Sequence, residues 1–186
     1  MHRPAVIDSI LLTATRIVTF DNQRAMTNAS GFFFRRDERL FLVTSRHVLV
    51  DAPSDHHPDR LEIELHNRPG DLGRSIGFSV PLYRLGKSLW RQGADGGGEI
   101  DIATIELDRA AMPASSVLQA FTPDHLQESQ TPLRVGSSLL IVGFPLGFHD
   151  TLHHLPVVRQ AVIASAFGMR FQGQGFFLTD ARTHRG

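Results

Sequence analysis

The sequence predicts an all-β protein, and two features of its pattern support this. Short apolar or alternating runs recur along most of the chain, and residues 61–65 alternate leucine or isoleucine with glutamate. Clusters of glycine, proline, asparagine and aspartate separate these runs at short intervals, as they do in β-barrels and β-sandwiches. No run of about 18 apolar residues occurs, so we expect neither a membrane-spanning helix nor a membrane partner.

Six strands are expected in the first unit, residues 1–107. Residues 10–20 are rich in threonine and β-branched side chains, which suit the pleated, half-buried surface of a sheet. The runs that follow are short and apolar, or alternate with period two between turn-forming clusters. In chain order the six strands span residues 10–20, 31–34, 40–44, 61–65, 77–83 and 102–107, and the turn clusters span residues 51–58, 67–73 and 93–98.

Three more strands are expected after a linker. Residues 108–132 contain alanine, serine and proline with little period-two signal, so we expect a connection with a short helical turn. The next unit, residues 133–186, has apolar runs at 138–143, 157–165 and 175–179. The chain therefore divides into two β units joined by a linker.

Composition limits the functional classes. The chain has 19 lysines and arginines and 19 aspartates and glutamates, a balance that argues against general binding of nucleic acid. The absence of cysteine excludes disulfides and cysteine-based metal sites or nucleophiles, and favours the cytoplasm over a secreted location. Asp8 and Arg16 bracket too short an apolar stretch for a signal peptide. Composition says nothing of oligomeric state.

Four separated segments together resemble the trypsin-like serine peptidases. Residues 28–34, NASGFFF, and 40–49, LFLVTSRHVL, resemble the glycine turn and the strand end that carries the catalytic histidine, and residues 99–107, EIDIATIEL, resemble the segment of the triad aspartate. VGSSLLIVGFPLG (135–147) and VVRQAVIAS (157–165) are similar to the first strands of the second barrel, and the last seven residues, DARTHRG, resemble the stretch before the nucleophile in bacterial HtrA-like proteases.

The resemblance implies a double antiparallel β-barrel with the active site in the cleft between two six-stranded barrels. Only about three of the second barrel's six strands are expected here, and the chain would stop about two residues before the catalytic serine. Because a barrel removes its edges only by closing, we expect an unpaired strand and uncovered apolar surface in the second unit.

The resemblance also assigns the catalytic roles. His47 would be the general base and Asp101 the carboxylate that orients it, since acyl transfer from an amide needs both beside a hydroxyl nucleophile. None of the thirteen serines lies in a Gly-x-Ser-Gly sequence. Gly186 corresponds to an oxyanion-hole donor. Residues Arg182, Thr183 and His184 would form one wall of the substrate pocket, where Arg182 either favours an acidic side chain or simply faces solvent.

Two other motifs suggest different chemistry. Residues 73–77 match the Gly-x-Ser-x-Gly elbow of α/β hydrolases around Ser75, but strand-like residues follow where that motif needs a helix. His149, His153 and His154 could ligate zinc only on a helix, and nearby prolines and glycines favour a loop. We therefore expect a surface turn at the first motif and no metal at the second.

The expected function is endoproteolysis of a polypeptide substrate by a Ser-His-Asp triad, without a cofactor. As it stands the chain lacks the nucleophile, so we expect it to be inactive. The alternative is a degenerate protease that binds peptides without cleaving them. A downstream x-Ser-Gly-x-Pro sequence after Gly186 would favour the enzyme, and another residue at the serine position would favour the binding module.

Overall fold

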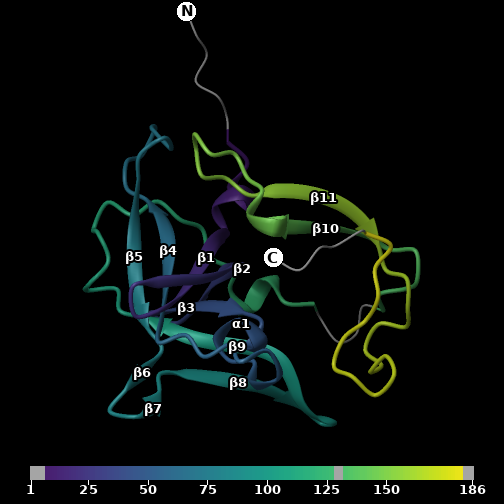
Figure 1. Cartoon of the computed structure of the whole chain (residues 1–186). Coiled ribbons are helices and arrows are strands. Elements are labelled where there is room, and N and C mark those ends of the chain that lie inside the picture. Colours follow the sequence, from purple (N-terminus) through teal and green to yellow (C-terminus); the bar gives the residue numbers. More distant parts are fainter. Residues whose placement is uncertain (1–6, 128–131, 182–186) are drawn as a thin grey trace, which may run out of the picture.

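The chain folds as an all-β protein, as its sequence predicts. The computed structural model describes residues 7–127 and 132–181. Helical structure in these residues is limited to short segments: the four-residue α1 (Arg46–Leu49) and 3-10 turns at Ser9–Leu12, Ala52–Ser54, Pro123–His125 and Pro145–Gly147. None of these helices is long and apolar enough to cross a membrane. Figure 1 shows a large curled sheet, a short hairpin at its edge and a separate two-stranded sheet.

Seven strands form the large sheet, and all neighbours in it are antiparallel. Its order is β5-β4-β1-β2-β3-β9-β8, so chain neighbours β1, β2 and β3 occupy its centre. A short β6–β7 hairpin, Tyr83–Arg84 with Lys87–Ser88, projects between β5 and β8. The strands of the sheet are β1 (Ala14–Asp21), β2 (Arg24–Arg36), β3 (Arg39–Thr44), β4 (Arg60–His66), β5 (Ser75–Pro81), β8 (Trp90–Asp95) and β9 (Gly98–Leu107).

The expected closed six-stranded barrel is not formed, because the hydrogen-bond ladder stays open between β5 and β8. Along the chain these two edge strands are separated only by the β6–β7 hairpin. The hydrogen bond from Leu89 N to Leu82 O, 2.9 Å, closes the base of that hairpin. Pro81 at the end of β5 has no N–H to donate. The chain thus leaves the large sheet after Pro81, and β5 does not pair with β8 to close a barrel.

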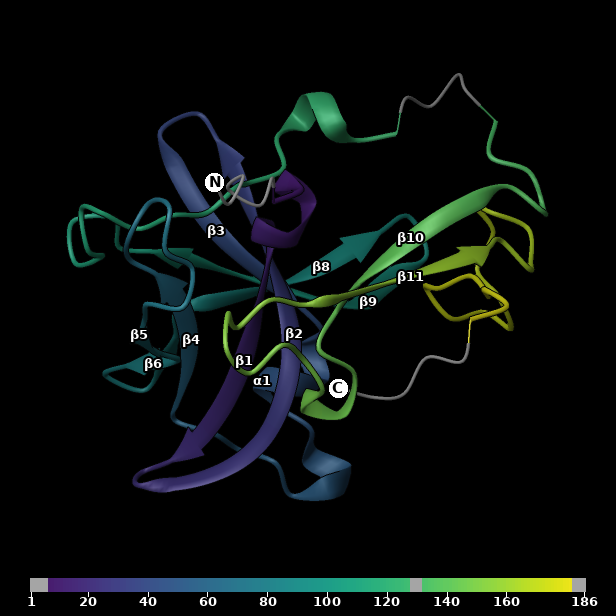
Figure 2. The same ribbon diagram turned by 90° about the horizontal axis from the view of Figure 1, so that it is seen from above.

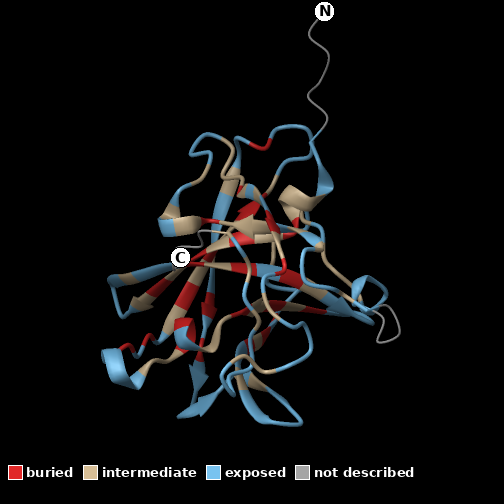
Figure 3. Ribbon diagram, turned by 90° about the vertical axis from the view of Figure 1, so that its right-hand side faces the viewer, coloured by how far each residue is buried: buried red, intermediate tan, exposed pale blue. Residues whose placement is uncertain are grey.

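The core lies inside the curl of this sheet. In β1 the residues alternate between buried and half-buried, which is the period of a strand with one face packed. Ile17, Leu42, Leu61 and Ile105 are at most 2% exposed and belong to one apolar cluster. Figure 3 shows the buried residues concentrated along these strands. The core of the first unit is therefore complete although its ladder is open.

In its described part, residues 132–181, the second unit contains one pair of strands, β10 (Ser138–Gly143) with β11 (Val157–Val162). Figure 2 shows the two strands side by side, outside the large sheet. The prediction of a third strand at residues 175–179 is wrong, since the structure has only an isolated bridge between Ile163 and Thr179 there. Ser165 interrupts the pairing there, because its Oγ rather than a backbone carbonyl accepts the N–H of Leu178.

Apolar surface remains uncovered in the second unit, as expected from the sequence. Leu140 on β10 and Val158 on β11 are 57% and 39% exposed. A cavity of about 540 Å³ separates β10 from the outer face of the large sheet, and Phe32, Phe121 and Leu140 are among its lining residues. The two-stranded sheet therefore covers only part of the surface against which it lies.

Residues 108–127 connect the units and pack along the large sheet. The backbone of Phe121 makes two hydrogen bonds to β2. Its N–H donates to the carbonyl of Phe33 at 2.9 Å, and its carbonyl accepts the N–H of Arg35 at 2.7 Å. The expected helical turn is present at Pro123–His125, where Thr122 and His125 form a capping box. This connection is an ordered part of the fold within the described residues.

Candidate active site

The register between β3 and β9 brings His47 and Asp101 together. Thr44, the last residue of β3, lies opposite Ala103 on β9. His47 follows Thr44 by three residues, and Asp101 precedes Ala103 by two, so antiparallel pairing places both at the same end of the two strands. Fifty-four residues of sequence separation are thereby closed by one strand pair.

The two side chains make the contact expected of a base and its orienting carboxylate. The His47 backbone N–H donates to Asp101 Oδ1 at 2.9 Å, and the ring Nδ1 lies 2.6 Å from Asp101 Oδ2. The aspartate oxygen accepts, so Nδ1 carries the proton in this contact. The neutral ring then has an unprotonated Nε2, which can take a proton from a hydroxyl. Both side chains are about half exposed, 48% and 54%, so the pair is open to substrate.

The turn that carries His47 is anchored by its neighbours. Val48 and Leu49 are buried at 7% and 0% exposure, while His47 on the same short helix faces outward. Buried His56 donates from Nε2 to the carbonyl of Val48 at 2.9 Å, since a carbonyl can only accept. These contacts fix the backbone on which the imidazole stands.

Arg170 from the second unit holds the turn that leads to Asp101. Its guanidinium donates to Asp95 Oδ1 at 2.5 and 3.2 Å and to the carbonyl of Gly98 at 2.9 Å. A Cβ added to Gly97 would lie 2.4 Å from Arg170, so the arginine fits closely against a bare backbone. The β8–β9 turn is thus tied to the second unit three residues before Asp101.

We expect Arg170→Gln to reduce stability in a pH-dependent way. The hydrogen bond from Arg170 is the main cause that lowers the pKa of Asp95 below its usual 3.8. A lowered carboxyl pKa stabilises the fold above the usual value, and this contribution is lost as pH falls through the lowered value. Urea unfolding should therefore separate wild type from variant at pH 7 and bring them together well below pH 3.8.

The matched control for this change is Arg36→Gln, which alters an exposed arginine on β2. It should leave the free energy of unfolding nearly unchanged at every pH. A difference between wild type and Arg170→Gln that persists undiminished down to pH 2 would show that the pair with Asp95 is not its source.

Ser30 provides a second connection between the units. Its hydroxyl oxygen accepts the backbone N–H of Phe144 at 2.8 Å, and its backbone carbonyl accepts the hydroxyl of Thr44 at 2.8 Å. Phe144 itself is only 1% exposed. Since Thr44 ends the strand that precedes His47, Ser30 links the second unit to the end of the sheet where His47 and Asp101 lie.

The Gly-x-Ser-x-Gly motif at residues 73–77 is only partly the surface turn that the sequence predicts, because Ser75 to Gly77 belong to strand β5. Ser75 begins β5, pairs with His66 on β4 and donates a hydrogen bond from its hydroxyl to Glu64. No helix follows it. Within the described residues no serine hydroxyl is hydrogen-bonded to the His47 ring, so Ser75 has neither the backbone nor the base that a nucleophile needs.

The histidine-rich loop is also non-helical. The ring Nδ1 of His149 donates a hydrogen bond to the carbonyl of Gly147 at 2.5 Å, and the ring Nδ1 of His153 lies 2.7 Å from Asp150 Oδ2. That bond lowers the pKa of Asp150. The rings of His149 and His154 stack with centroids 6.1 Å apart. In residues 7–127 and 132–181 no group of three or more histidine, aspartate or glutamate side chains is placed to hold a metal ion.

Several expected site residues lie outside the described residues, namely Arg182, Thr183, His184 and Gly186. Their pocket and oxyanion roles stay predictions. Conversely, the sequence reasoning missed Arg170 and Asp95, which are separated by 75 positions. No local motif marks such a pair, whereas the glycines at 96–98 did indicate a turn in which a carboxylate could cap the backbone.

Comparisons with known proteins give a weak likeness in structure. No family model matches the chain, and no curated protein matches it. The scabies mite inactivated protease paralogue S-I1 is similar at 16% identity and a TM-score of 0.48, covering 95% of this chain and 82% of that one. Human heparin binding protein is similar at 14% identity and 0.47, covering 99% and 79%. Both have the trypsin-like serine protease fold.

Proposed function

We propose that the chain is a trypsin-like serine endopeptidase domain of the HtrA-like branch, with His47 as general base and Asp101 as its orienting carboxylate. The observation that carries the proposal is the pair of bonds from His47 to the two oxygens of Asp101. One bond holds the backbone and the other fixes the tautomer, so Nε2 is left as the basic atom. His153 makes the same two kinds of bond to Asp150 within one loop, whereas His47 and Asp101 come from the ends of two paired strands, 54 residues apart in sequence.

The chemistry follows from this arrangement. Nε2 takes the proton of a serine hydroxyl as the oxygen attacks the peptide carbonyl, and later returns it to the leaving amine. Asp101 stabilises the imidazolium that forms between these steps. The proposal assigns the nucleophile to none of the thirteen serines within the 186 residues, since none in the described part of the chain is bonded to the His47 ring.

The test is labelling by a fluorophosphonate probe, which reacts with activated serines. The natural gene product, expressed in full from its coding region, is expected to be labelled at a single serine and to cleave casein. The 186-residue chain is expected to do neither, since loss of the nucleophile costs roughly 10⁶ in turnover. His47→Ala serves as the inactive control.

Two results would contradict the proposal. Labelling that maps to a serine within the 186 residues, with Ser75 the first to examine, would assign a different nucleophile. An unlabelled natural product that binds unstructured polypeptide would favour the second candidate, a peptide-binding module that retains the fold without the chemistry.

A further inference from the structure

Leu85, at the tip of the β6–β7 hairpin, departs from two rules of folded proteins at once. Its side chain is 97% exposed. Its φ is 51°, and Gly86 follows at 75°, so both central residues of the turn are left-handed. Such a turn favours asparagine or aspartate before glycine, and a leucine there is strained. Of seven non-glycine residues with positive φ in the described chain, only Leu85 and Leu146 are aliphatic.

The segment around this hairpin is basic in a chain of zero net charge. Residues 75–94 contain Arg84, Lys87 and Arg91 and no acidic residue. The rest of the chain has 16 lysines and arginines against 19 acidic residues. The hairpin therefore presents a positive field to a molecule that approaches it, around a leucine that no part of the described fold covers.

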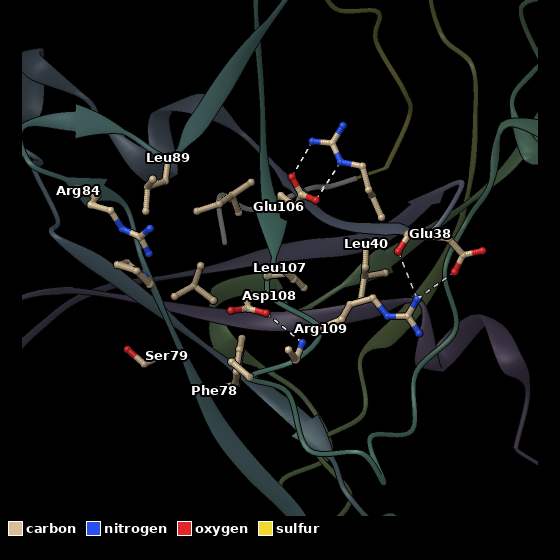
Figure 4. A pocket seen from close by; sticks show the side chains of 16 residues that line it. Glu38, Leu40, Phe78, Ser79, Arg84, Leu89, Glu106, Leu107, Asp108 and Arg109 are labelled. Carbon is tan, nitrogen blue, oxygen red and sulfur yellow. Dashed lines mark hydrogen bonds and ion pairs between the residues drawn. The ribbon is translucent and has the colours of Figure 1, made fainter.

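A cavity of about 660 Å³ opens beside the hairpin. Its floor includes the core side chains Ile105 and Leu107, each 2% exposed, and its wall includes Leu89 at the base of the hairpin. Figure 4 shows Arg84 and Leu89 on one side of this cavity and the Glu106 and Arg109 groups on the other. An apolar floor with a charged rim suits one large apolar side chain on a charged ligand.

The charges on the rim leave Arg84 as the available cation. Glu106 is held by Arg39 through two bonds of 2.6 and 2.9 Å, and Glu38 lies 3.9 Å from Arg109. Arg84 has no acidic partner among the described residues, and its guanidinium points toward the cavity in Figure 4. The remaining acid, Asp108, accepts the backbone N–H of Ala110 at 3.0 Å.

The cavity also lies where the ladder of the large sheet is open. Phe78 and Val80 of the edge strand β5 line it. An edge strand presents unpaired backbone groups that can bond an added extended segment. A lipid surface has no extended backbone to bond this edge and no single side chain to fill a concave floor, whereas a polypeptide in extended conformation has both.

We propose that the β6–β7 hairpin and the adjoining cavity form a docking site for an extended, acidic polypeptide segment that carries a large apolar side chain. The apolar side chain occupies the cavity, carboxylates of the segment meet Arg84 and Lys87, and Leu85 packs on the bound chain. The site is built by β5, β6, β7 and β9 away from His47, so it does not depend on the proteolytic function proposed above.

The test uses the 186-residue chain and a fluorescein-labelled peptide, Glu-Asp-Glu-Leu-Phe-Asp-Glu-Asp, followed by fluorescence anisotropy. Binding is expected to weaken with added salt and to vanish for a peptide with lysine at every acidic position. Trp90, the sole tryptophan, begins β8 next to Leu89 and gives a second, intrinsic signal.

The informative variant is Leu85→Asn. Asparagine is better suited than leucine to the left-handed conformation, so the urea unfolding midpoint should stay unchanged or rise. Peptide affinity should nevertheless fall by about tenfold or more. Leu146→Asn is the matched control, since Leu146 is 70% exposed at φ 52° and, unlike Leu85, has no lysine or arginine adjacent to its turn in the sequence.

Arg84→Gln tests the electrostatic part and should reduce both affinity and its dependence on salt. The proposal is overturned if wild type does not bind the peptide at about 1 mM, or if Leu85→Asn and Arg84→Gln bind like wild type. It is also overturned if the chain ignores the peptide but sediments with phosphatidylserine vesicles in a Leu85-dependent way, because the hairpin would then be a lipid anchor.

Discussion

Under the proposed peptidase function, replacing Asp101 with asparagine in the natural gene product is expected to lower kcat by about 10⁴-fold. The amide oxygen can still accept the backbone N–H of His47, so the shape of the turn is retained. The amide NH₂ then faces Nδ1 and donates to it, which forces the proton to Nε2. The ring is held in place but presents the wrong tautomer to the nucleophile.

Steady-state hydrolysis of a peptide substrate measures this effect. The Asp95→Asn variant is the matched control, since it makes the same chemical change on the same hairpin but contacts Arg170 rather than His47. It is expected to lower stability while keeping kcat within a few fold of wild type. Equal losses of kcat in both variants would mean that Asp101 acts only through the fold.

Leu49→Ala is expected to destabilise the protein by about 2–5 kcal/mol. Leu49 is fully buried in the main core cluster, and truncation leaves a cavity beneath the helix that carries His47. The free energy of unfolding in urea is the measurement. Leu152→Ala removes the same atoms from a side chain that is 68% exposed and should change stability by no more than about 0.5 kcal/mol.

The loss should extend to the site, because Leu49 and Val48 hold the turn of α1 against the core. Under the proposed peptidase function, the kcat of the natural gene product should fall further in Leu49→Ala than in a variant of similar instability on another element, such as Ile63→Ala on β4. If both variants lose stability equally and retain wild-type kcat, the packing beneath α1 does not position His47.

Apolar periodicity predicted most strands of the large sheet, and the resemblance to trypsin-like peptidases predicted the meeting of His47 with Asp101. The strand ends that carry the two residues could be predicted from the local apolar pattern. Antiparallel pairing of β3 with β9 then places both ends side by side. Strand β8 was missed because its sequence, WRQGAD, mixes polar residues with glycine and belongs to an edge. Its partly exposed position gives the sequence little reason to alternate.

The opposite error occurred at residues 175–179. Their apolar run, with Phe176 and Phe177, has the composition of a strand, yet only the Ile163–Thr179 bridge forms. The phenylalanines pair with other aromatic rings instead, Phe176 with Phe171 and Phe177 with Phe167. Contacts between distant segments, such as these rings and the Arg170–Asp95 pair, leave no periodic signal in sequence.

The tautomer of His47 shows whether Asp101 prepares the ring as a base, and ¹⁵N NMR of the 186-residue chain can measure it. We expect a protonated Nδ1 bonded to Asp101 and an unprotonated Nε2 at a pH where the ring is neutral, with the two reversed in Asp101→Asn. A wild-type spectrum with the proton on Nε2, or one that Asp101→Asn leaves unchanged, would show that Asp101 does not prepare His47 as a base.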